Sequence, residues 1–118
     1  MSLDREAQLA EVPLLGEIVA AIEAELAWAR RHGRALSLLA LPISDVAPDG
    51  PQGRATDTIA VAPEHDRFVM LLPETTGPEA RRLAERVCGG PPSAAAVASF
   101  PGDAATVEGL LLHLATEG

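Results

Sequence analysis

The spacing of apolar residues predicts a helix followed by a buried strand in the first third of the chain. Apolar side chains recur every three or four residues over 13–32 while charged side chains occupy other faces, which is the pattern of an amphipathic helix. Gly33 is placed to end this helix. Residues 36–41 are apolar on both faces of the pleat, which is typical of a central strand covered on two sides. Pro42 closes the strand, because proline cannot donate to a central ladder.

Turn and capping residues divide the rest of the chain into further elements. Two glycines and two prolines make residues 47–53 a loop. Thr76 and Glu79 form a capping-box pattern at the start of a helix, and Gly89 ends that helix. The remaining predicted elements are a hairpin with strands at 58–62 and 67–72, a strand at 94–99 and a last helix at 106–115.

The predicted element order is α-β-β-β-α-β-α, without an internal repeat or a shift in composition. It predicts one α/β domain over residues 1–118, of the α+β, palm or ferredoxin-like kind, with a mixed sheet of about four strands and helices packed on it. A chain of this length is expected to build a single core. Residues 1–12 are expected to be a flexible lead-in.

The composition argues against several classes of partner and ligand for this domain. The formal net charge is −8, whereas binding to nucleic acid or to an acidic membrane needs a dense cationic surface. The single cysteine, Cys88, excludes an internal disulfide, and no cysteine or histidine cluster has the spacing of metal ligands. No apolar run reaches the roughly 20 residues of a membrane helix, and no signal peptide is evident. We therefore expect no metal, no nucleic acid, no membrane contact and a cytoplasmic location.

One hairpin carries the candidate chemistry. Arg54 and Asp57 form an Arg-x-x-Asp motif that is followed by five strand residues, a turn and Phe68, and the next strand runs into Leu-Pro-x-Thr at Thr75. This hairpin resembles the signature of the GGDEF family, the diguanylate cyclase domains, in which a Gly-Gly-Asp-Glu-Phe turn joins the two strands. The resemblance extends over most of the chain, through residues 27–41, 79–86, 98–103 and 106–111.

The catalytic positions of the family are largely replaced. The resemblance implies a reaction that joins two GTP molecules and uses carboxylates to hold metal ions. Pro42 and Ser44 stand where the family has Asp-x-Asp at the end of its first strand. In the turn, His65 replaces a glycine, Asp66 keeps a family carboxylate, and Arg67 replaces the glutamate. A positive charge about 4 Å from a metal ion costs on the order of 4 kcal/mol at an effective dielectric constant of 20. We therefore expect no enzyme activity and no cofactor.

The feedback site of the family is matched at three positions. In the family, Arg-x-x-Asp binds cyclic di-GMP together with an arginine from the helix after the turn, and the matching residues are Arg54, Asp57 and Arg86. Arginine grips a phosphate or a guanine edge with two hydrogen bonds, and aspartate accepts hydrogen bonds from guanine N–H groups. The same residues also fit a structural interpretation, in which Asp57 caps the hairpin and both arginines are solvated cations.

A second interpretation is purely structural. The family has a helix between its first strand and Arg-x-x-Asp, and residues 47–53 replace this helix by a loop. The deletion predicts an uncovered apolar face on the first strand, which a second copy or a neighbouring domain of a longer signalling protein would bury. Two functions stay open: an inactive regulatory module in bacterial cyclic di-GMP signalling, and a dimerisation or interaction domain without a nucleotide ligand.

Overall fold

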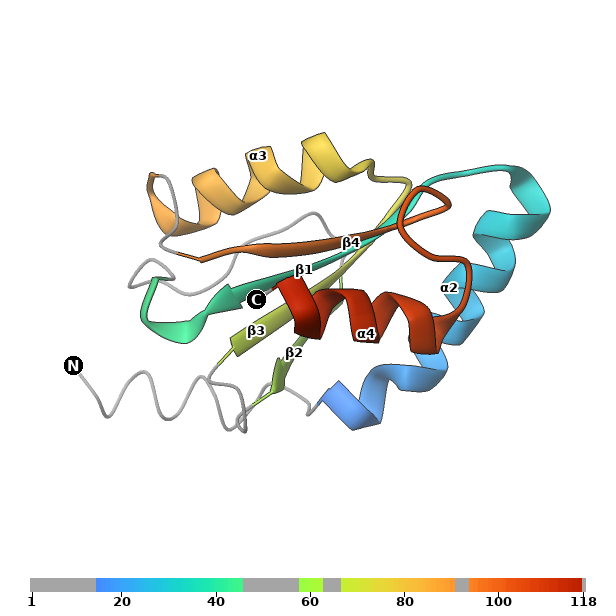
Figure 1. Ribbon diagram of the computed structural model, residues 1–118, viewed down its shortest axis with the longest axis horizontal. Helices are drawn as coiled ribbons and strands as arrows, with labels where there is room; N and C mark the ends of the chain where they lie inside the picture. The colour runs from blue at the N-terminus through green and yellow to red at the C-terminus, as the bar shows by residue number, and fades with distance from the viewer. Residues whose placement is uncertain (1–14, 46–57, 63–66, 91–93, 118) are drawn as a thin grey trace.

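A computed structural model describes residues 15–45, 58–62, 67–90 and 94–117 of the chain. In chain order the elements are η1 (Leu15–Ile18), α2 (Val19–His32), β1 (Leu36–Pro42), η2 (Ile43–Asp45), β2 (Thr58–Ala62), β3 (Arg67–Pro73), α3 (Gly77–Cys88), β4 (Ala96–Phe100) and α4 (Val107–Glu117), where η denotes a 3₁₀ helix. In Figure 1, α3 lies on one side of the sheet, and α2 and α4 lie on the other. The predicted lead-in 1–12 and loop 47–53 lie outside the described residues. Within those described, no helix is long and apolar enough to span a membrane.

The strands form one sheet in the order β2-β3-β1-β4. All three pairings between the described strands are antiparallel. The predicted α/β domain with a four-stranded sheet is therefore confirmed, and its neighbouring strands are antiparallel rather than partly parallel. β3 lies between β1 and β2 and is antiparallel to both of them. The chain reverses its direction in the hairpin between β2 and β3, so β3 can pair with both strands in this way.

The ends of the helices follow the capping residues predicted from the sequence. Gly33 ends α2 with a left-handed φ of 64°, and its N–H donates to the carbonyl oxygen of Ala29. α3 begins with a capping box, in which the Thr76 side chain accepts from the N–H of Glu79 and the Glu79 side chain accepts from the N–H of Thr76. Gly89 ends α3 with a φ of 73°. Glycine suits both ends because a side chain would strain this backbone region.

Several element boundaries differ slightly from the sequence prediction. β4 spans Ala96–Phe100 instead of 94–99, and α4 spans Val107–Glu117 instead of 106–115. Thr106 lies just outside α4 because its side chain caps the helix, with Oγ1 accepting from the N–H of Gly109 at 3.0 Å. In the described part of the first predicted helix, the 3₁₀ turn η1 precedes α2.

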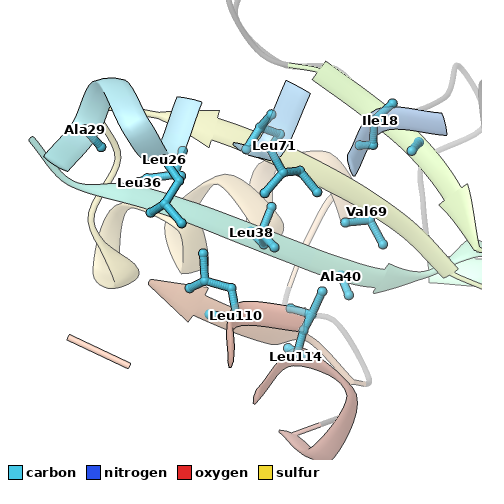
Figure 2. Packing of buried hydrophobic residues seen from close by; sticks show 14 residues of the cluster. Ile18, Leu26, Ala29, Leu36, Leu38, Ala40, Val69, Leu71, Leu110 and Leu114 are labelled. Carbon is cyan, nitrogen blue, oxygen red and sulfur yellow. The ribbon is translucent and has the colours of Figure 1, made fainter. Parts of the chain in front are cut away.

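One face of the sheet packs against α2 and α4. Alternate residues of β1 point to this face, as the pleat of a strand requires. Figure 2 shows Leu38 of β1 near the centre of the labelled side chains. The cluster of buried residues comprises Ile18, Ile22, Leu26, Ala29, Leu36, Leu38, Ala40, Ala60, Val69, Leu71, Ala96, Ala98, Leu110 and Leu114.

The opposite face is covered by α3, and the predicted uncovered face of the first strand is wrong. Leu39 and Leu41 belong to this side of β1, and both side chains are fully buried within the single chain. They share a buried cluster with Ile43 of η2 and with Ala80, Leu83, Ala84 and Val87 of α3. The prediction assumed that the face stays uncovered when the family's helix before Arg-x-x-Asp is absent. It was wrong because α3 contacts both β1 and β4 and covers this face. Binding of a second copy or of a neighbouring domain stays a prediction, and this buried face of β1 does not support it.

Candidate functional site

Two of the positions that the sequence resemblance matches to metal ligands lie at one end of the sheet. Pro42, the last residue of β1, lies directly opposite Arg67, the first residue of β3. Ser44 follows in η2 and is exposed. His65 and Asp66 lie outside the described residues. The fold therefore brings Pro42 and Arg67 together, with Ser44 two residues further along the chain.

Arg67 is held at this end of the sheet by a neighbouring segment. Its side chain is partly buried, and Nη1 donates to the carbonyl oxygen of Ala94 at 3.5 Å, shortly before β4. Because β1 lies between β3 and β4, the guanidinium reaches across the end of β1. A positive charge in this place repels a divalent cation. Across the described ranges, no group of three or more His, Cys, Asp or Glu side chains could hold a metal ion.

A groove beside α3 contains the third predicted ligand residue, Arg86. The volume of the groove is about 690 Å³. Arg82 lines it together with Arg86, and because the two are four residues apart, both side chains leave the same face of the helix. The other described lining residues are Thr75, Glu79, Leu83, Glu85 and Gly90.

The other two predicted ligand residues, Arg54 and Asp57, lie outside the described residues, so their convergence with Arg86 stays a prediction. β2 begins at Thr58 opposite Leu71, toward the end of β3 from which the chain enters α3. Arg86 is in the last turn of α3, about 13 Å from the start of that helix at about 1.5 Å per residue.

A buried hydrogen-bond network fixes the entry into α3. Ser37 of β1 is fully buried, and its Oγ donates to the carbonyl oxygen of Thr75 at 2.6 Å. Oγ of Ser37 also lies 3.0 Å from Oγ of Ser99 on β4. Gly77 permits this arrangement, since a Cβ there would lie 3.2 Å from Oγ of Ser99. Thr75 also lines the groove, so the network supports one wall of it. Sequence reasoning missed the network, whose signal was a serine inside an apolar strand.

Comparison with known proteins gives a likeness in structure, whereas the comparisons of sequence give no match. No protein-family model and no curated protein matches this chain. Among solved structures, the chain is similar to the GGDEF domain of PA1120 (YfiN or TpbB) from Pseudomonas aeruginosa, with a TM-score of 0.73 and 20% sequence identity. The match covers 92% of this chain and 88% of that chain. The chain therefore has a GGDEF-like fold.

Proposed function

We propose that this chain is a catalytically inactive GGDEF-like module that binds cyclic di-GMP and regulates a longer signalling protein in the bacterial cytoplasm. The observation that carries the proposal is the pairing of Pro42 with Arg67 at the end of β1 and β3. These are positions at which the resemblance to the family places metal-binding carboxylates. Without these carboxylates, the end of the sheet lacks ligands for the metal ions that the reaction needs.

The loss of activity follows from charge. The cyclase reaction needs divalent cations that neutralise the triphosphate and activate the attacking hydroxyl. Proline has no side-chain atom that can bind a metal ion. A neutral serine hydroxyl is a poor substitute for a carboxylate as a ligand of hard cations. Arg67 adds a charge of the same sign as the metal, held beside the end of β1 by Ala94. Replacing Arg67 alone leaves the first-strand ligand missing.

Arg86 supports the binding half of the proposal. The residue is exposed in the α3 groove. Its guanidinium makes no hydrogen bond or ion pair with any residue in the part of the chain that the structure describes. A guanidinium in this state is ready for bidentate contact with a phosphate or a guanine edge.

The inactivity is tested by incubating the purified chain with GTP and Mg²⁺ and measuring cyclic di-GMP by chromatography, beside an active cyclase as the positive control. We expect no product from the wild type or from Arg67→Glu. A variant that combines Pro42→Asp, Ser44→Asp and Arg67→Glu tests whether the missing charges are sufficient for activity. Product from the wild type that disappears in Asp66→Ala would contradict the proposal.

The binding is tested by calorimetric titration with cyclic di-GMP. Each charged hydrogen bond contributes roughly 1.5–3 kcal/mol, so Arg54→Ala is expected to weaken binding by about one to two orders of magnitude. Arg31→Ala is the matched control, because Arg31 is an exposed arginine on α2, on the other side of the sheet from α3. If cyclic di-GMP does not bind at all, the alternative of an interaction domain without a nucleotide ligand is favoured.

A further inference from the structure

We propose that α2 pairs with α2 of a second copy of this chain, in an antiparallel and two-fold symmetric arrangement centred on Ala24. The surface lies on the opposite side of the sheet from α3. The inference goes beyond the proposed function, because it names a docking surface and its partner and does not rest on the binding of cyclic di-GMP.

The outer face of α2 is apolar although it is exposed. It consists of Ala20, Ala24, Ala27 and Trp28, whose spacing of three and four residues places them on one side of the helix. The buried residues of α2 lie on the opposite side and pack into the core. A helix on the surface of a monomer normally presents charged and polar side chains to solvent. An apolar outer face therefore indicates that this side of α2 also contacts a partner.

Charged side chains border the outer face and mark its two ends. Glu23 and Glu25 are next to Ala24 in the chain, so each points about 100° to one side of it. They can stay in solvent at the rim of a helix pair. At the ends, Glu17 in η1 and Arg31 in the last turn of α2 are both exposed. The partner must therefore match an apolar centre with one negative and one positive end.

A second copy in antiparallel orientation provides this match. A two-fold axis at Ala24 brings Trp28 beside Ala20 of the second copy, because both are four residues from the centre. It brings Arg31 beside Glu17 of the second copy, because both are seven residues from the centre, about 10 Å along the helix at about 1.5 Å per residue. Each contact forms twice by symmetry.

Charge selects the antiparallel orientation. A parallel pair would place Arg31 against Arg31 and Glu17 against Glu17, and like charges across an interface oppose association. In the antiparallel pair both ends carry opposite charges. Glu17 also interacts within its own chain, and a carboxylate has about four acceptor sites, so it can accept from Arg31 of the second copy as well.

Trp28 is held in place before a partner binds. Its ring lies against that of His32, with centroids 4.5 Å apart and an angle of 39° between the planes. A side chain that is already ordered loses less conformational entropy on association. The small side chains of Ala20 and Ala24 let a second helix approach closely, which brings the indole of Trp28 into contact with it.

The size of the surface limits the affinity that we expect. α2 has 14 residues, about four turns, so a helix pair buries less than the roughly 1,200–2,000 Å² of a standard stable interface. Two chains with a formal charge of −8 also repel each other, although salt screens this repulsion. We therefore expect a weak dimer, with a Kd on the order of 10–100 μM.

The test is sedimentation equilibrium of the full chain without nucleotide, over concentrations of about 5 μM to 1 mM. The fluorescence of Trp28 gives a local measurement, because it is the only tryptophan of the chain and is 39% exposed. We expect dimers at the higher concentrations and a shift of the emission to shorter wavelength as they form, because the indole leaves water.

Two kinds of variant test the arrangement. Ala24→Glu places two carboxylates at the two-fold axis and is expected to raise the Kd at least about tenfold. Ala115→Glu is the matched control, at an exposed alanine of α4, with an expected change below about twofold. Arg31→Glu is expected to raise the Kd about five- to tenfold, and adding Glu17→Arg is expected to restore it to within about threefold.

The outcomes decide between a second copy and other partners. A chain that stays monomeric at all these concentrations overturns the inference and favours a neighbouring domain as the partner of this face. Dimers with unchanged Trp28 emission, or equal weakening by Ala24→Glu and Ala115→Glu, also overturn it. Rescue of Arg31→Glu by Glu17→Arg supports the antiparallel pairing. Circular dichroism of each variant confirms that folded proteins are compared.

These outcomes are separate from the test of the proposed function. The α3 groove and α2 lie on opposite sides of the sheet (Figure 1), and sedimentation is measured without nucleotide. A monomeric chain that binds cyclic di-GMP overturns the helix pair and supports the proposed function. A dimer through α2 that does not bind cyclic di-GMP supports the helix pair and contradicts the proposed ligand.

Discussion

The two faces of the sheet carry similar aliphatic side chains but different polar ones. Among the described residues, the buried polar side chains are Ser37 and Thr75, and neither lies on the face under α2 and α4. The face under α3 contains, besides its apolar cluster, the buried Ser37 and its hydrogen bond to Thr75. The groove with Arg82 and Arg86 lies beside the same helix. The comparison teaches that both faces hold the domain together, whereas the buried polar network and the larger groove lie on the side of α3.

The number of covering helices gives a physical reason for this difference. α2 and α4 contact each other as well as the sheet, and the groove between them, of about 410 Å³, is smaller than the one beside α3. On the other face, α3 contacts β1 and β4, and it leaves a groove along its side. A groove exposes part of a helix to solvent, where arginine is stable without a partner in the chain.

The largest effect is expected from shortening a side chain in the apolar face. Leu38→Ala removes a fully buried side chain, so we expect the free energy of unfolding to fall by about 2–5 kcal/mol. Urea denaturation followed by circular dichroism measures it. Leu112→Ala on α4 is the matched control, because that side chain is 66% exposed, and its effect is expected within about 0.5 kcal/mol. Equal losses in the two variants would refute this assignment of the core.

A smaller effect is expected from the polar network of the other face. Ser37→Ala leaves the carbonyl oxygen of Thr75 and the hydroxyl of Ser99 without their shared partner. We expect a loss of about 1–3 kcal/mol in the free energy of unfolding, together with chemical-shift changes at the entry into α3. Ser44→Ala removes an exposed hydroxyl and serves as the control. If Ser37→Ala is neutral, the network does not hold this wall of the groove.

The smallest effect concerns the start of α3. Thr76→Ala removes the capping hydrogen bond from the N–H of Glu79, which costs about 1 kcal/mol of stability. Hydrogen exchange of the amide of Glu79 is expected to become faster, because that N–H loses its acceptor. Thr116→Ala in α4, also an exposed threonine, controls for the substitution itself. Unchanged exchange at Glu79 would mean that the cap does not order this turn.

Local signals made much of this fold predictable from the sequence. The glycines at 33 and 89 and the capping box at Thr76 act within a few residues, so the ends of α2 and α3 followed from them directly. The hairpin strands β2 and β3 followed from alternation and turn residues, and the structure places them as expected. The resemblance carried by Arg54, Asp57 and the strand ending before Thr75 indicated the fold that the structural comparison supports.

The candidate site was only partly predictable. Pro42 and Arg67 stood out because the resemblance matches them to catalytic carboxylates, and the structure adds that they lie directly opposite each other. Arg86 was expected from the resemblance, whereas Arg82 was not, because its part in the groove depends on how α3 lies on the sheet. Ser37 was missed for the same reason: its partners Thr75 and Ser99 are 38 and 62 residues away in the chain.

The sequence by itself determined which segments become helices and strands and which residues stand at the positions matched by the resemblance, because periodicity, caps and residue identity are local properties. The tertiary structure alone decided that α3 buries Leu39 and Leu41, that a serine of β1 holds the entry into α3, and that two arginines share a groove. These features depend on the crossing of a helix over a sheet and on contacts between residues far apart in the chain. The pattern of apolar residues predicts that such faces must be covered. It does not predict which helix covers each face or what space is left beside that helix.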